Sequence, residues 1–237
     1  MRWLRWGLGA LAALFIIPIL EVGCVRFANP PLTPLMLLRQ LESRPSSSAA
    51  PERRFEWVAL EAMPPVFLQC VLFSEDQRFF EHRGFDWKEI HAARKRAGSR
   101  PIRGASTITM QCARSLFLWQ GRSWVRKGLE AYYTFWMETC LSKRRILELY
   151  ANVIELGDGI YGIEAAAQAH YEMQARQLSR EQCAMMAALL PSPRSRRPDH
   201  PDSSLVMRQA RILRHAKSTP SLDRVLSETA SKTSAPK

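Results

Sequence analysis

A charge-free apolar run close to the N-terminus constrains the fold of this chain more strongly than any other feature. Residues 6–20 read WGLGALAALFIIPIL, and the apolar character continues to Val25 with Glu21 as its interruption. A helix of about 20 apolar residues spans the hydrocarbon core of a bilayer. We therefore predict a single N-terminal transmembrane helix over residues 6–25.

Two arginines indicate the orientation of this anchor. Arg2 and Arg5 precede the apolar run, and the positive-inside rule places such an end in the cytoplasm. We therefore predict a cytoplasmic N-terminus over residues 1–5, a single pass through the cell inner membrane, and a main domain in the periplasm. A cleaved signal peptide stays open as the alternative because the run is short, although no clean Ala-x-Ala cleavage site follows it.

Charge and cysteine content narrow the choice of partners. The 237 residues carry 34 Lys+Arg against 22 Asp+Glu, which gives a formal net charge of +12. Such an excess favours nucleic acid, phosphate-bearing substrates or an anionic membrane surface as partners, and it does not bear on the fold. The five cysteines show no CxxC or Cys/His metal spacing. We therefore predict neither a zinc site nor a required disulfide.

The rest of the chain divides into a connector, one domain and a tail. Residues 26–54 combine a short apolar helix with a Pro/Ser-rich stretch that is typical of a linker. From residue 55 to residue 217 the apolar residues recur mostly at helical spacing, so we predict a mainly α domain there. Residues 218–237 lack an apolar face, and we expect them to form a flexible tail.

Four polar clusters interrupt the predicted helices. They lie at residues 74–84, 103–111, 126–130 and 143–152. Glu75 and Asp76 directly follow an apolar run, where an ionised group is costly unless it faces a cleft or a partner. Taken alone, a helix-end ion pair with Arg78 or His82 is the more common explanation of these two carboxylates.

The other clusters also allow two interpretations each. The second offers hydroxyl and amide groups that either bind sugar or phosphate oxygens or cap a helix: Ser106, Thr107 and Gln111. In the third, Arg126 and Glu130 are four residues apart, and a surface pair at this spacing contributes only about 0.3–0.5 kcal/mol. The fourth begins with a basic run from Lys143, which either binds phosphate or is solvated.

Together the clusters resemble the glycosyltransferase domain of family 51, the peptidoglycan polymerases. The motifs that carry the resemblance are SEDQRFFEHRGFDW, RGASTITMQ, GRSWVRKGLE and SKRRILELYANVIELGDGIYGIEAAA, in this order. The resemblance covers about residues 55–214 and implies a lysozyme-like, mainly helical fold with two lobes around a cleft. It implies lipid II, the growing glycan chain and the lipid bilayer as partners. Too few residues follow for a transpeptidase domain, so we expect glycosyl transfer alone.

The resemblance also implies roles for individual residues. Glu75 would be the general base that activates the acceptor hydroxyl. Glu130 would lie near the donor pyrophosphate, where it orients this group or holds a divalent cation, Mg or Mn; no tightly bound cofactor is implied. The implied substrate-binding residues are Asp76, His82, Ser106, Thr107, Gln111, Arg114, Arg126 and Lys127. The implied supporting residues are Lys143, Glu148, Tyr150 and Asn152.

Several positions depart from the family pattern. Met110 and Ser115 stand where the family usually has glutamine and asparagine, and Arg114 replaces a lysine. Residues 170–174 read HYEMQ and lack a basic residue that is customary there. Arginine and lysine differ in geometry, but both carboxylates remain. We therefore expect activity, with an altered rate or substrate preference.

Three other functions stay open on the sequence. A lytic transglycosylase or lysozyme-like hydrolase shares the helical fold and an essential glutamate, but its neutral leaving group needs no cations around Glu130. A catalytically weak or silent scaffold for other cell-wall synthesis or division proteins is the non-enzymatic alternative, motivated by Met110 and Ser115. Nucleic acid is the weakest candidate partner, because the basic residues are scattered and the domain is predicted to be periplasmic.

Overall fold

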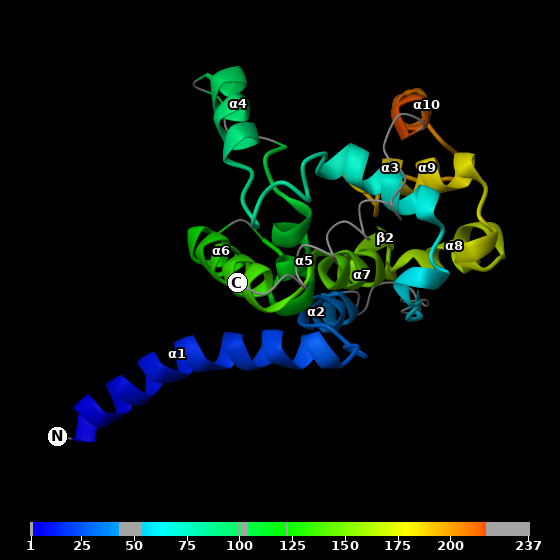
Figure 1. Ribbon diagram of the computed structural model, residues 1–237. Coiled ribbons are helices and arrows are strands. Elements are labelled where there is room, and N and C mark those ends of the chain that lie inside the picture. Colours follow the sequence, from blue (N-terminus) through cyan, green and yellow to red (C-terminus); the bar gives the residue numbers. More distant parts are fainter. Residues whose placement is uncertain (1, 43–53, 99, 101–103, 122, 217–237) are drawn as a thin grey trace, which may run out of the picture.

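The computed structural model describes residues 2–42, 54–98, 100, 104–121 and 123–216 (Figure 1). Its α-helices are α1 (Arg2–Phe27), α2 (Pro34–Glu42), α3 (Pro65–Glu75), α4 (Trp87–Ala97), α5 (Ile108–Phe117), α6 (Trp124–Cys140), α7 (Lys143–Val153), α8 (Ile163–Tyr171), α9 (Arg180–Leu189) and α10 (Ser203–Ala216). The described residues also form two 3-10 helices, η1 (Leu60–Ala62) and η2 (Ala175–Gln177). The prediction of a mainly helical domain is confirmed. The two-lobed arrangement stays a prediction, and the tail predicted over 218–237 lies outside the described residues.

The first helix lies along the domain rather than apart from it. Figure 1 shows α1 running beneath α6, and Tyr132 of α6 donates a hydrogen bond to the backbone carbonyl of Phe15 at 3.3 Å. Tyr133 donates to the Glu21 carboxylate, the one charged group within the predicted anchor. None of the helices in the described part of the chain combines the length and the apolar character that a membrane crossing needs. The anchor over residues 6–25 stays a prediction.

The core forms where α3 packs on α9, α5 packs on α6 and α7, and α10 covers α3 and α9 (Figure 1). Fully buried side chains such as Phe67, Ile108 and Tyr150 fill it. The five cysteines are all unpaired, and Cys70 and Cys112 are fully buried in this core. Because the helices pack in this order, the C-terminal end of α3 lies beside α5 and α10.

Hydroxyl side chains begin the central helices. Each accepts a hydrogen bond from the backbone N–H three residues ahead, which satisfies one of the donors that a helix start leaves unpaired. These N-cap residues are Thr107 of α5, Ser123 of α6, Ser142 of α7 and Ser179 of α9. The capping interpretation of the second polar cluster is therefore confirmed for Thr107.

Three short strands form a small sheet that the sequence pattern does not predict. They are β1 (Arg54–Phe55), β2 (Glu155–Gly157) and β3 (Ile160–Tyr161), in the order β1-β3-β2. β2 and β3 are antiparallel, and β1 joins β3 in parallel. Strands this short carry no apolar alternation over the four to eight residues that a sequence prediction needs.

Gly162 lies between β3 and α8 in a backbone conformation that other residues avoid. Its φ is 79°, and a Cβ placed on it would lie 2.5 Å from the backbone oxygen of Asn152. We expect Gly162→Ala to lower the free energy of unfolding by roughly 3 kcal/mol, measured by urea denaturation. Gly128→Ala in α6 is the control, since nothing lies within 4 Å of a Cβ there and alanine is the better helix former. Equal stability of the two variants would contradict this expectation.

Candidate active site

Glu75 is the last residue of α3 and is held from two other helices. Its Oε2 accepts a hydrogen bond from Gln111 Nε2 of α5 at 3.1 Å, and its Oε1 accepts one from Arg208 Nη2 of α10 at 2.9 Å. The carbonyl oxygen of the Gln111 side chain accepts in turn from the hydroxyl of Tyr150, which is fully buried on α7. The position of the Glu75 carboxylate is therefore set by α5, α7 and α10 together.

Two opposing influences act on the protonation of Glu75. Burial raises the pKa of the Glu75 carboxyl, because the charged form loses hydration. The hydrogen bond from Gln111 and the charges of Arg208 and Arg114 act in the opposite direction, and burial prevails. A carboxylate whose pKa is raised, yet which still faces a cation, is suited to accept a proton near neutral pH.

A cavity of about 360 Å³ lies directly against Glu75. Ser106 contributes to its wall beside Asp76, and Arg78 and Asp86 line the same space. Thr107 also lines it, but the Thr107 hydroxyl is already engaged, since it donates to the backbone oxygen of Gly84 at 2.6 Å and caps α5. Hydroxyl groups of this kind donate to and accept from the hydroxyl groups of a sugar, and carboxylates accept from them.

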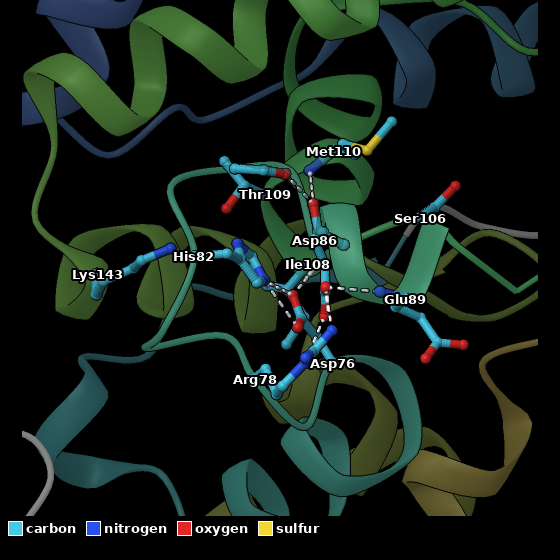
Figure 2. Close-up of polar contacts among 12 residues, drawn as sticks. Asp76, Arg78, His82, Asp86, Glu89, Ser106, Ile108, Thr109, Met110 and Lys143 are labelled. Atoms are coloured by element: carbon cyan, nitrogen blue, oxygen red, sulfur yellow. Dashed lines mark hydrogen bonds and ion pairs between the residues drawn. The ribbon is translucent and has the colours of Figure 1, made fainter. Parts of the chain in front are cut away.

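A buried network fixes the loop that follows Glu75 (Figure 2). Asp76 accepts hydrogen bonds from His82 Nε2 at 2.9 Å and from the backbone N–H of Ile108 at 3.0 Å. Arg78 pairs with Asp86, which caps α4. The sequence-based interpretation of these carboxylates as helix-end partners therefore holds for Asp76 with His82, whereas Glu75 has other partners.

A second carboxylate, Glu130 of α6, lies among cations. It is fully buried, and its two oxygens accept hydrogen bonds from Arg126 Nη1 and Lys127 Nζ, both at 2.6 Å. Arg114 Nη1 of α5 lies 3.9 Å from it. The pair at i,i+4 spacing is therefore not a surface pair, because Arg126 is also buried.

Two of these cations, Arg114 and Arg126, line a second cavity, which is the larger one at the site. It has a volume of about 720 Å³, and its wall includes Gln111, Arg114, Ser115 and Arg126. Gln111 thus links the two parts of the site, since it lines this cavity and hydrogen-bonds Glu75. The site combines a largely buried carboxylate with a cation-lined space, an arrangement suited to a leaving group that carries negative charge.

The side chains at the site are already engaged with protein groups, which does not fit a metal ion at Glu130. Both Glu130 oxygens accept from cations, and a metal would have to displace Arg126 or Lys127. Among the described residues, Asp76, His82 and Asp86 also offer ligand atoms within 4.8 Å of one another. Asp76 and Asp86 already bind other donors, so this group fits an ordering role better than metal ligation.

The residues implied as supports lie around the site rather than in it. Lys143 donates to Glu138 at 2.8 Å, and burial lowers the pKa of the Lys143 ammonium. Glu148 accepts from Arg145 at 2.6 Å. Asn152 is fully buried, and its side chain hydrogen-bonds the backbone N–H and the backbone carbonyl of Val58. These two hydrogen bonds join α7 to the segment that leads into α3.

Arg208 belongs to the site, although no pattern in the sequence indicates this. It lies 133 positions after Glu75 and reaches it because α10 packs against α3. α10 also carries Arg211 and Arg214, and no local pattern distinguishes Arg208 from these two exposed arginines. Only its burial against a carboxylate of another helix marks it.

Known proteins match this chain over most of its length. The sequence profile of the transglycosylase family matches residues 42–217. A biosynthetic peptidoglycan transglycosylase of Bdellovibrio bacteriovorus is 44% identical over 210 residues, which cover 88% of this chain and 84% of the relative. Proteins of the same name are 43% identical over 220 residues in Xylella fastidiosa and 42% identical over 217 residues in Xanthomonas campestris pv. campestris. The Xylella match covers 91% of this chain and 90% of the relative, and the Xanthomonas match covers 91% of this chain and 88% of the relative.

Sequence and structure agree on the kind of protein this is. The profile match spans the helices that hold both Glu75 and Glu130. The relatives are more than 40% identical across nearly all of their own length. The chain therefore belongs to the transglycosylase family.

Proposed function

We propose that this enzyme is a peptidoglycan glycosyltransferase that polymerises lipid II into β-1,4 glycan strands during cell-wall synthesis. The observation that carries the proposal is the pairing of a largely buried carboxylate, Glu75, with a neighbouring space lined by Arg114 and Arg126. A proton acceptor next to an anion-binding space is what transfer from a pyrophosphate donor needs.

The reaction is a single inverting displacement. The 4-hydroxyl oxygen of the acceptor lipid II attacks the anomeric carbon of the growing chain, and its proton passes to Glu75. The bond from the anomeric carbon to the pyrophosphate oxygen breaks, and undecaprenyl pyrophosphate leaves with the electron pair. The α-linked donor thus becomes a β-linked product. The cavity beside Glu75 would take the acceptor sugar, with Ser106 and Asp76 at its wall.

The cations of the larger cavity would bind the departing pyrophosphate. Arg126 is held between Glu130 and the backbone oxygen of Gly121, so its guanidinium is oriented before substrate arrives. Arg114 lines the same cavity and adds a second positive charge, and the partly exposed Lys127 is paired with the same Glu130. Preorganised charge of this kind stabilises the negative charge that develops on the leaving group. Glu130 then acts as the positioning group of this cluster.

The proposed substrate also gives a reason for the apolar N-terminus. Lipid II is anchored in the membrane by its undecaprenyl chain, and a crossing over residues 6–25 would hold the enzyme at the same surface. With the N-terminus in the cytoplasm, the domain would act on the periplasmic face of the inner membrane. Other cell-wall synthesis or division proteins are the proposed protein partners, and no step involves nucleic acid.

The proposal is tested by incubating the detergent-purified full chain with lipid II and separating the glycan products by gel electrophoresis. Polymer is expected, and pre-formed glycan should stay intact. Cleavage of the glycan would indicate a lytic transglycosylase or lysozyme-like hydrolase. Neither polymer nor cleavage would indicate a scaffold. Parallel reactions with Mg²⁺, with Mn²⁺ and with EDTA test whether a divalent cation is required. We propose that such a cation activates the reaction without being bound by Glu130.

The ion pair between Arg208 and Glu75 predicts a pH effect. Glu75 must be ionised to accept a proton, and the Arg208 charge acts to lower the pKa of Glu75. Arg208→Gln removes this influence, so the pKa of Glu75 rises and less of it is ionised at a given pH. We expect the acidic limb of the kcat/KM profile for lipid II polymerisation to move to higher pH. Arg208→Lys keeps the charge and should move the limb less.

The exposed Arg214 of the same helix provides the control for this measurement. Arg214→Gln changes the net charge of the protein by the same amount but leaves the Glu75 pair intact. Its acidic limb should coincide with that of the wild type. An Arg208→Gln profile that also coincides with the wild type would show that Arg208 has only a structural role.

A further inference from the structure

A third cavity, of about 920 Å³, lies where the end of α1 meets α6 and α7. It shares no lining residue with the two cavities beside Glu75 and Glu130, so the proposed reaction does not use it. Four cations line it, against two carboxylates, Glu81 and Glu138. The cations are Arg26, Arg83, Lys143 and Arg144.

The charges of this cavity are only partly matched by protein groups. Lys143 is paired with Glu138, and Arg144 is paired with Glu61, which lies outside the cavity. Arg83 is exposed and has no hydrogen bond or ion pair within the part of the chain that the structure describes. The N-terminus of α7 also lies in the wall, and the positive end of its dipole adds to the attraction for an anion.

His82 and several apolar side chains also line this cavity. The His82 side chain is only 8% exposed. When its Nε2 proton is donated to Asp76, its Nδ1 is an acceptor, and no donor reaches Nδ1 from the described residues. Apolar side chains complete the wall, including Phe80 and Phe135, and Phe135 is exposed on α6.

The position of the cavity indicates where such a ligand comes from. Arg26 stands in the last turn of α1, and its Nη1 donates to the backbone oxygen of Cys140 at 2.9 Å, which ties the end of α1 to this cavity. Upstream on α1, Phe15, Ile17 and Leu20 each expose more than half of their surface. Apolar exposure that ends in a cation-lined cavity matches the boundary between the acyl chains and the headgroups of a bilayer.

We propose that this cavity binds the headgroup of an anionic phospholipid. The phosphate would lie between Arg83 and Arg144, and the acyl chains would follow Phe135 toward α1. Phosphatidylglycerol, whose phosphodiester carries one negative charge, is a phospholipid of this kind. The proposal rests on the membrane placement given under the proposed function, but not on the glycosyl transfer itself.

The test measures lipid retention by native mass spectrometry of the full chain released from an uncharged detergent. Dioctanoyl phosphatidylglycerol is the probe, and dioctanoyl phosphatidylcholine and glycerol 3-phosphate are the comparisons. We expect phosphatidylglycerol to bind at least about tenfold more tightly than either comparison. The cationic choline of phosphatidylcholine would be repelled by the cations of the cavity, and glycerol 3-phosphate lacks the acyl chains that would pack along Phe135. Equal binding of phosphatidylcholine, or equal binding of glycerol 3-phosphate, would overturn the proposal.

Two variants locate the site. Arg83→Gln should lower the affinity for phosphatidylglycerol about tenfold, and its fold is not at risk because Arg83 is exposed and makes no ion pair with the residues that the structure describes. Lys95→Gln removes one exposed charge from α4 and is the matched control, with unchanged affinity expected. Equal affinities of the two variants would place the lipid elsewhere. Polymerisation of lipid II is measured separately, so an inactive chain that still retains phosphatidylglycerol would contradict the proposed function alone.

Discussion

Replacing Glu75 with glutamine is expected to reduce lipid II polymerisation about 10³-fold, because removing a general base costs roughly 10²–10⁴ in rate. The loss should appear in kcat with little change in KM, since the amide keeps the shape of the side chain and its contact with Gln111. Initial rates of glycan formation over a series of lipid II concentrations measure both constants.

The fold of this variant should remain intact. The Glu75 side chain is largely buried, and an uncharged amide there avoids the desolvation that raises the pKa of the carboxyl. The thermal midpoint should therefore not fall by more than a few degrees. Glu181→Gln, an exposed carboxylate on α9, serves as the control and should polymerise at the wild-type rate. Full activity of Glu75→Gln would exclude Glu75 as the base.

Replacing Glu130 with alanine should impair both stability and activity. Glu130 is fully buried, and its removal leaves the guanidinium of Arg126, itself buried, without its counter-charge. Breaking a buried ion pair in this way costs roughly 3–5 kcal/mol. In a chain of this size the thermal midpoint should fall by roughly 6–20 °C. Polymerisation should be lost as well, because Arg126 would no longer be held at the wall of the larger cavity.

A double variant separates the two effects. Arg126→Leu combined with Glu130→Leu removes both buried charges, so most of the lost stability should return while polymerisation stays absent. The exposed pair of Arg96 and Glu89 on α4 provides the comparison, since Arg96→Gln should cost less than about 1 kcal/mol. A Glu130→Ala protein that unfolds at the wild-type temperature would contradict a structural role for the Glu130 cluster.

The capping hydroxyls and the carboxylate network show how far local sequence patterns reach. Thr107 begins a helix because its hydroxyl satisfies a backbone N–H three residues ahead, a relation contained within one turn. The spacing of Arg126 and Glu130 likewise brings them together on any helix. Their burial does not follow from the spacing, because it depends on α5 covering this side of α6. Local spacing therefore predicted the pair, and packing determined how strongly it matters.

Patterns in the amino-acid sequence were enough to predict the mainly helical class, the order of the motifs and the two carboxylates of the site. These features depend on helical periodicity and on residues within a few positions of one another. Three contacts became known only from the packing of the helices. Arg208 reaches Glu75 across 133 positions, Gln111 hydrogen-bonds Glu75 while it lines the larger cavity, and three short strands pair. Such contacts depend on how helices pack, and packing is a property of whole surfaces that no local pattern records.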